Sequence, residues 1–135
     1  MVILCIDDDS EDVELFCEAV RTIDESYTCV VAKNGQQGLE VLRYLLPDFI
    51  FLDVNMPVLD GKSTLKAIRG TTVFKQLPIC MYSTSITSWE NEMYRSMGAD
   101  HCMVKPNSFD KLCEALRSIF LPTRFQLLPA DRSLN

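Results

Sequence analysis

Hydrophobic residues gather in short runs along the chain, and a segment with helical spacing follows each run. The first run is Val2 to Ile6, and later runs of the same kind occupy residues 28–32, 49–52, 79–82 and 101–104. Runs of four or five such residues bounded by polar ones are typical of strands that are buried on both faces. We therefore predict five strands of one buried sheet.

Between these runs, apolar residues recur every three or four positions, which predicts amphipathic helices. The predicted stripes are Val13-Phe16-Val20-Ile23, Leu39-Leu42-Leu46, Leu65-Ile68, Trp89-Met93-Met97 and Leu112-Leu116-Ile119-Phe120. Ser10 and Ser108 precede the first and last stripes and are predicted helix caps, and Pro47 is predicted to end the second helix. Trp89 is interpreted as a core residue, with a partner-binding anchor as the alternative.

Strict alternation of strands and helices predicts an α/β fold with a parallel sheet between two layers of helices. Right-handed connections leave few topologies, and the flavodoxin-like (βα)5 three-layer sandwich with strand order 2-1-3-4-5 is the common choice for five repeats. We predict one domain over residues 1–121. Residues 122–135 contain Pro122 and Pro129, lack periodicity and are predicted to form a C-terminal tail.

Composition narrows the classes of function. The net charge is -6 and no basic stripe is present, so nucleic-acid binding is not expected. The chain has no signal-peptide pattern, and no apolar run approaches the roughly 18 residues that span a bilayer. These features predict a cytoplasmic protein that does not associate with membranes.

The six cysteines do not form a metal-binding pattern. They are Cys5, Cys17, Cys29, Cys80, Cys102 and Cys113. No Cys-x-x-Cys motif occurs and His101 is the only histidine, so a zinc site is not expected. We interpret the cysteines as small apolar residues kept reduced in the cytoplasm.

Acidic residues follow two of the predicted strands. Asp7, Asp8 and Asp9 follow the first strand and Asp53 follows the third. In the predicted strand order these strands are neighbours at the switch point, where ligands bind in open α/β sheets. Carboxylates packed this closely repel one another and need a positive counter-charge. A site for a divalent metal cation is favoured over simple helix capping.

Polar residues follow the other strand ends as well. Asp53 is suited to metal binding, general base catalysis or nucleophilic attack, and the backbone carbonyl of Asn55 is a possible further metal ligand. Ser83 follows the fourth strand and Lys105 the fifth. Taken alone, each is more often a loop hydroxyl or a solvated surface charge. Together with the acids, they predict one crevice that binds an oxyanion.

These residues give the chain a strong resemblance to the receiver domains of bacterial response regulators in two-component signalling. The resemblance extends from about residue 2 to 121. The matching motifs are Ile6-Asp7-Asp8-Asp9, Phe51-Leu52-Asp53-Val54-Asn55-Met56-Pro57 with Asp60-Gly61, Ser83-Thr84, Gly98-Ala99-Asp100 and Lys105-Pro106. Each motif is weak alone, but their joint spacing is specific.

The resemblance implies that Asp53 accepts a phosphoryl group from a phosphohistidine. The donor would be a sensor histidine kinase or a histidine phosphotransfer protein. It also implies that Mg²⁺ (or Mn²⁺) is bound by the carboxylates of Asp8 and Asp53 and the backbone carbonyl of Asn55, and by Asp7 mainly through water. The phosphorylated protein would then signal by binding partners and would not turn over an external substrate.

Further roles follow from the same resemblance. Ser83 would be the switch hydroxyl, and Lys105 would hold the phosphoryl oxygens, with a cis peptide bond between Lys105 and Pro106. Many receiver domains carry an aromatic residue where this chain has Cys102, so the usual rotation of that ring is not expected here. The downstream target would bind the fourth helix, fifth strand and fifth helix of a stand-alone receiver.

Three alternatives are open. A flavodoxin would need a hydroxyl- and glycine-rich loop after the first strand, where this chain has three aspartates. A phosphohydrolase of the haloacid dehalogenase type would need an aspartate two residues after Asp53, where Asn55 stands. A protein-binding scaffold that has lost phosphorylation is the remaining alternative, although all the key residue types are present.

Overall fold

Five strands alternate with helices in the computed structural model, which describes residues 1–121. The strands are β1 (Val2–Ile6), β2 (Thr28–Ala32), β3 (Phe49–Asp53), β4 (Ile79–Ser83) and β5 (His101–Val104). The α-helices are α1 (Ser10–Ile23), α2 (Gly35–Val41), α3 (Gly61–Arg69), α4 (Ser88–Ser96) and α5 (Phe109–Phe120), and a short 3₁₀ helix, η1, spans Thr72–Phe74. The predicted alternation is confirmed.

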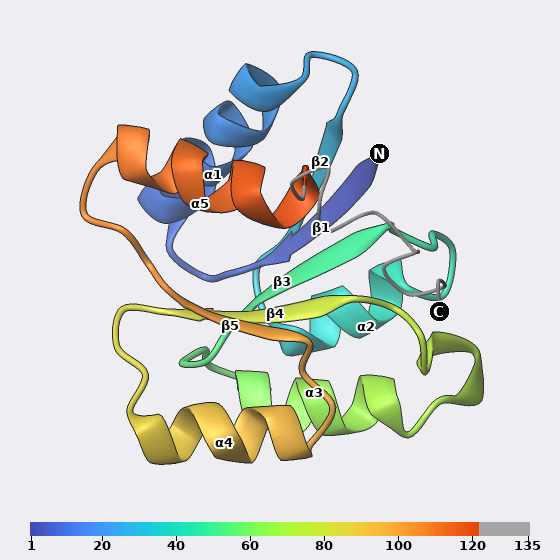
Figure 1. The fold of residues 1–135 in the computed structure, drawn as a ribbon. Coiled ribbons are helices and arrows are strands. Elements are labelled where there is room, and N and C mark those ends of the chain that lie inside the picture. Colours follow the sequence, from blue (N-terminus) through green and yellow to red (C-terminus); the bar gives the residue numbers. More distant parts are fainter. Residues whose placement is uncertain (122–135) are drawn as a thin grey trace, which may run out of the picture.

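The strands form one parallel sheet in the order β2-β1-β3-β4-β5, as predicted for a flavodoxin-like fold. Helices α1 and α5 cover one face, and α2, α3 and α4 cover the other (Figure 1). Ile6 of β1 pairs with Leu52 of β3. The residues that follow these two positions, Asp7 and Asp53, therefore meet at one edge of the sheet.

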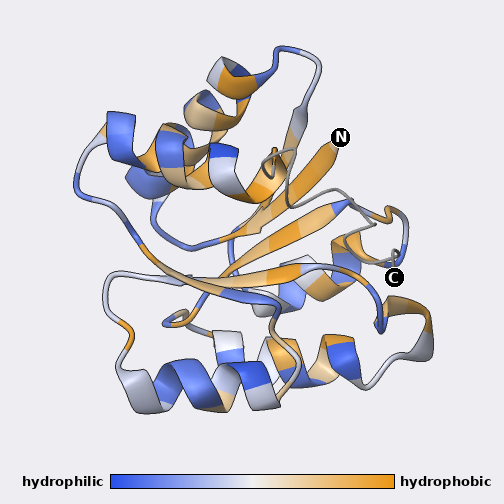
Figure 2. Cartoon of the chain, in the orientation of Figure 1, coloured by the Kyte–Doolittle hydropathy of each residue, from blue (hydrophilic) through white to orange (hydrophobic). Residues whose placement is uncertain are grey.

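The sheet separates two hydrophobic cores. Every residue of β3 and β4 is buried, and in Figure 2 the strands are largely hydrophobic while the helices carry polar residues on their outer sides. Aromatic rings fill the core under α1 and α5, where Phe51 lies 4.8 Å from Phe16 and 5.8 Å from Phe120 between ring centroids. Aliphatic residues dominate the core under α2, α3 and α4.

Two predictions of helix caps had different outcomes. Ser108 caps α5, where its side chain accepts a hydrogen bond of 3.2 Å from the backbone N–H of Lys111. The cap of α1 is Asp9 and not Ser10, because the Asp9 carboxylate accepts from the N–H groups of Glu11 and Asp12 at 3.0 and 3.1 Å. A carboxylate is favoured there because it also complements the positive end of the helix dipole.

The second helix is shorter than predicted. It ends at Val41, and the last bonds tighten to the 3₁₀ type, with the N–H of Arg43 bonded to the carbonyl of Glu40 at 3.1 Å. Leu42 is still buried, but Leu46 is 64% exposed. Proline disfavours helical backbone angles only at the residue directly before it, here Leu46, so Pro47 keeps the helix from reaching Leu46 but does not set its end at Val41.

The core assignment of Trp89 was wrong, because its side chain is 69% exposed. The buried side of α4 centres on Tyr94, which is 3% exposed. Trp89 lies five residues earlier, about 140° around the helix, and therefore faces outward.

Within residues 1–121, no helix has the length and apolar character needed to cross a bilayer. The predicted tail, residues 122–135, lies outside the described residues.

Candidate functional site

Three carboxylates converge at the carboxyl edge of β1 and β3. Asp7 is 2% exposed and Asp53 is 6% exposed, whereas Asp8 is exposed. Each contributes an oxygen, and these oxygens all lie within 4.8 Å of one another. The parallel pairing of β1 with β3 creates this arrangement, because both strands end at the same level. The structure thus brings these sequence-predicted residues together.

Lys105 extends from the end of β5 into the same acidic cluster. Its Nζ lies 2.8 Å from Asp7 Oδ2, 2.9 Å from Asp12 Oδ2 and 3.7 Å from Asp53 Oδ1. The side chain is only 10% exposed, and its Nζ also lies 5.2 Å from the centre of the Tyr82 ring. Lys105 is therefore a buried cation that faces three acids and not a solvated surface charge.

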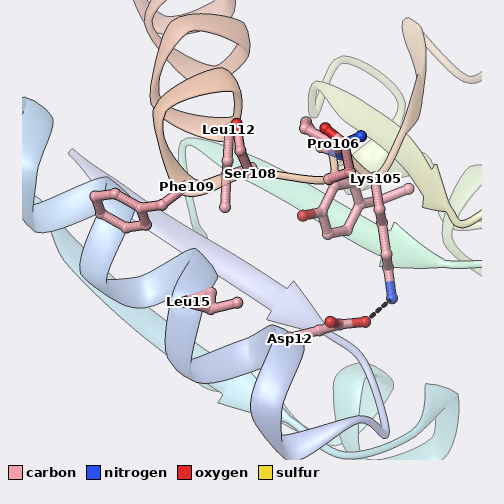
Figure 3. A pocket seen from close by; sticks show the side chains of 9 residues that line it. Asp12, Leu15, Lys105, Pro106, Ser108, Phe109 and Leu112 are labelled. Atoms are coloured by element: carbon pink, nitrogen blue, oxygen red, sulfur yellow. Dashed lines mark hydrogen bonds and ion pairs between the residues drawn. The ribbon is translucent and has the colours of Figure 1, made fainter.

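Asp12 also belongs to this site, although the sequence pattern did not single it out. Helical side chains lean toward the helix N-terminus, which directs Asp12 back to the end of β1. Its position shortly after the run of three aspartates was the available signal. Figure 3 shows Asp12 and Lys105 paired beside a pocket between α1 and α5. This pocket of about 160 Å³ is lined also by Leu15, Phe109 and other residues.

Burial and the charges in the site shift the pKa values of Asp53 and Lys105. Burial raises the pKa of Asp53 to about 7, Asp7 adds to the rise, and Lys105 opposes it. For Lys105, burial disfavours the charged form, but hydrogen bonds to Asp7 and Asp12 hold the pKa above its usual value. The lysine is therefore charged, while Asp53 is poised between its two protonation states near neutral pH.

The donor set fits a hard divalent cation. Mg²⁺ prefers carboxylate, carbonyl and water oxygens, and Asp7, Asp8 and Asp53 are the one group of three potential metal-binding residues found in residues 1–121. Burial is the main cause of the raised pKa of Asp53, and repulsion from Asp7 and Asp8 adds to it; a cation would relieve that repulsion.

Ser83 and Asn55 lie at the same edge of the sheet. Ser83 ends β4, is 1% exposed, and accepts a hydrogen bond of 2.7 Å from the backbone N–H of Lys105 through its carbonyl. Asn55 is an exposed residue two positions after the end of β3. Residues 1–121 contain no cis peptide bond, so the expected cis geometry at Lys105-Pro106 was wrong. The trans form is the lower-energy isomer of most X–Pro bonds.

The loop between β3 and α3 packs tightly against the backbone of Asp53. The N–H of Gly61 bonds to the carbonyl of Val54 at 2.9 Å, and a Cβ atom on Gly61 would collide with the Asp53 carbonyl. Val58 has a φ of 69°. The N–H of Leu59 bonds to the carbonyl of Pro57 at 2.8 Å, which makes a tight three-residue turn. Strained turns of this kind are common near functional sites.

Cys102 occupies the position where many receivers have an aromatic ring. It is partly buried beside the core under α4, and its Sγ lies 3.9 Å from the carbonyl of Asn91. Tyr94 is already buried in that core.

Comparisons with known proteins agree with this arrangement. Residues 3–117 match the response regulator receiver domain family. The chain is 33% identical over 117 residues to the transcriptional regulatory protein CpxR of Escherichia coli, an alignment that covers 87% of this chain and 48% of CpxR. This chain thus spans about half the length of that relative.

Two shorter relatives align over most of their length. Protein PilG of Pseudomonas aeruginosa is 29% identical over 113 residues, which cover 82% of each protein. A solved structure of the chemotaxis protein CheY4 of Vibrio cholerae superposes with a TM-score of 0.77 and 27% identity, covering 87% of this chain and 97% of CheY4. The family match extends over nearly the whole described domain, and the chain belongs to the response regulator receiver domain family.

Proposed function

We propose that Asp53 receives a phosphoryl group from a phosphohistidine on a sensor histidine kinase or a histidine phosphotransfer protein. The observation that carries this proposal is the convergence of Lys105 Nζ with Asp7 at 2.8 Å and with Asp53 at 3.7 Å. Phosphoryl transfer depends mainly on positioning and on neutralising charge. A buried lysine next to an acceptor carboxylate supplies part of both.

The metal site completes this charge balance. Asp8, Asp53 and the backbone carbonyl of Asn55 would hold Mg²⁺ (or Mn²⁺), which neutralises charge on the transferring group when bound. Both carboxylate oxygens of Asp7 already have partners, because Oδ1 accepts from the N–H of Asp9 at 2.9 Å and Oδ2 accepts from Lys105. This supports a role for Asp7 through metal-bound water.

Ser83 and Lys105 would read the phosphorylated state. Phosphorylation adds negative charge and oxygens that accept hydrogen bonds. Lys105 would move from its acidic partners toward these oxygens, and the Ser83 hydroxyl would donate to them. Because the Ser83 carbonyl bonds to the Lys105 backbone N–H at 2.7 Å, movement of either residue is transmitted between β4 and β5.

The output of the switch is binding to a downstream protein through α4, β5 and α5. Trp89 at 69% exposure and Val104 at 49% exposure provide apolar anchors on this region. We propose that the protein acts in the bacterial cytoplasm as a signalling phosphoacceptor, and that it does not turn over external substrates. Asn55 supports the absence of turnover, because a phosphohydrolase of the haloacid dehalogenase type would need a second aspartate at this position.

Intact-mass measurement after incubation with acetyl phosphate and Mg²⁺ tests the proposal. We expect a gain of one phosphoryl group that is absent in Asp53→Asn. The matched control is Asp110→Asn, which changes an exposed acid in the first turn of α5 and should be phosphorylated normally. A wild-type mass that does not change with any phosphodonor would contradict the proposal and favour a scaffold that binds partners without phosphorylation.

A further inference from the structure

Two cysteines meet outside the acidic site. Cys17 lies on α1 and Cys29 lies on β2, and their sulfur atoms are 2.7 Å apart. Both side chains are partly buried, unlike Cys5, Cys80 and Cys113, which are buried. The two sulfurs are already closer than ordinary contact and need to approach by only about 0.7 Å to reach the length of a disulfide bond.

We propose that Cys17 and Cys29 are a redox modification site that forms a reversible disulfide with a peroxide oxidant. The Cys17 thiolate attacks one oxygen of hydrogen peroxide, which breaks the O–O bond and gives a sulfenic acid and hydroxide. The Cys29 thiol then attacks the sulfenic sulfur, the S–O bond breaks, the S–S bond forms and water leaves. Two thiols are oxidised and one peroxide is reduced to two waters.

The local environment assigns different roles to the two sulfurs. The hydrogen bond between the two thiols lowers the pKa of Cys17 to about 7, with burial opposing the shift and Arg21 assisting it. The same hydrogen bond, together with burial, raises the pKa of Cys29. Burial also raises the pKa of Cys102. Arg21 lies one helical turn after Cys17 on α1 and favours its thiolate, so we assign Cys17 as the attacking sulfur and Cys29, in contact with it, as the sulfur that resolves the sulfenic acid.

A metal site is the weaker explanation of this pair. Structural zinc sites need four ligands, but no set of three cysteine, histidine or acidic side chains converges here within the described part of the chain. Only two sulfurs are in contact, and Cys5 is buried on the neighbouring strand β1. Two thiols with one acidified member fit disulfide chemistry better.

Peptide mapping of the full chain tests the site. Trypsin cuts after Arg21 and Lys33, so the disulfide would link peptide 1–21 to peptide 22–33. Native protein treated with hydrogen peroxide should lose two of its six free thiols, show this link after the other thiols are blocked, and recover six thiols with dithiothreitol. Peptide 1–21 also contains Cys5, so a second cleavage after Glu11 or Glu14 identifies the linked cysteine.

Matched variants make the result decisive. The link should persist in Cys5→Ala and in Cys102→Ala, and it should disappear in Cys17→Ala and Cys29→Ala. A native protein that keeps all six thiols, or one whose link runs through Cys5 or Cys102, overturns the proposal. Cys17 and Cys29 lie outside the acidic cluster, so formation of the disulfide and phosphorylation of Asp53 can fail or succeed independently.

A melting curve provides the second measurement. The bond would join α1 to β2 and close the turn between them, which restricts the unfolded chain. We expect the oxidised protein to melt about 5 °C or more above the reduced protein, with the difference removed by dithiothreitol. An oxidised form that melts at or below the reduced one would show that the bond distorts the native fold and would count against the assignment.

Discussion

At the scale of single residues, the charge on Asp53 opposes folding when no cation is bound. The pKa of Asp53 is raised from 3.8 to about 7. Near pH 4 the Asp53 carboxyl of the folded protein is protonated, so most of the free-energy cost of burying its charge is absent. Between pH 4 and 7 the folded protein retains a proton that the unfolded chain releases, so stability falls as pH rises. Above pH 7 the full penalty, on the order of a few kcal/mol, remains.

We therefore predict that Asp53→Asn stabilises the metal-free protein in a pH-dependent way. The free energy of unfolding should rise by roughly 2–4 kcal/mol at pH 8 and change little at pH 4. Urea denaturation at the two pH values measures the difference. Asp110→Asn, at an exposed position, should leave stability nearly unchanged. An equal gain from Asp53→Asn at both pH values would mean that packing, and not charge, controls this position.

Lys105 stabilises the folded protein, whereas the charge on Asp53 destabilises it, because Lys105 is the buried partner of several acids. Replacing it with methionine would leave Asp7, at 2% exposure, without its cation. Removal of one member of a buried pair typically costs about 3–5 kcal/mol, and we predict a loss of this size for Lys105→Met at pH 7. The double variant Lys105→Met/Asp7→Asn should recover part of the loss. Additive losses in chemical denaturation would argue against direct coupling.

The remaining residue-level contacts show what sequence can and cannot predict. The acids and Lys105 were identifiable because they follow predicted strands. The contact between Lys105 and Asp12 joins residues 93 positions apart, and a helical position alone gave no sign of it. Similarly, Cys17 and Cys29 appeared only as members of two separate elements.

At the scale of elements, the β3–α3 loop contains a strained residue. Val58 is 79% exposed and has a φ of 69°, a conformation that a β-branched residue rarely adopts. Glycine adopts positive φ freely. We predict that Val58→Gly raises the free energy of unfolding by about 0.5–1 kcal/mol, measured by thermal or chemical denaturation.

Val73→Gly is the matched control for this prediction. Val73 is 70% exposed and lies in the 3₁₀ helix η1, where φ is negative. Glycine there should lower stability by about 0.5–1 kcal/mol because it adds entropy to the unfolded chain. Equal losses for both variants would show that the turn at Val58 carries no strain of consequence.

Element boundaries were less predictable than the elements themselves. The apolar stripe of the second helix continued to Leu46, but the chain must turn toward β3 before Pro47, and the helix ends at Val41. In α4, the spacing of Trp89 matched that of the methionines, yet tertiary packing turned Tyr94 toward the sheet. The periodicity of apolar residues identifies a helix and its apolar side, whereas packing against the sheet determines which residues of that side are buried.

At the scale of the whole molecule, the topology was predictable because alternating strands and helices permit few arrangements. Right-handed connections and a sheet covered on both faces leave few arrangements, and the common choice among them for five repeats, β2-β1-β3-β4-β5, is the order observed. That order places Asp7 and Asp53 side by side. The detailed partners of the site depend on side-chain directions, which strand order does not determine.

The concentration of negative charge at the edge of the sheet makes overall stability dependent on cations. Asp7, Asp8 and Asp53 offer oxygens within 4.8 Å of one another. A cation that binds only the folded protein at ten times its Kd adds about 1.4 kcal/mol to the free energy of unfolding. We predict that Mg²⁺ raises the melting temperature by a few degrees. Asp53 must be deprotonated to bind the cation, so the rise should be larger at pH 8 than at pH 6.

Two variants connect this stabilisation to the site. Asp8→Ala should reduce the effect of Mg²⁺, because it removes the exposed carboxylate of the cluster. Glu114→Ala, which removes an exposed acid on α5, should retain it. Equal responses of both variants to Mg²⁺ would mean that the cation screens the net charge of -6 in general and does not bind at the proposed site. A larger loss in Asp8→Ala would instead locate the stabilisation where β1 and β3 end.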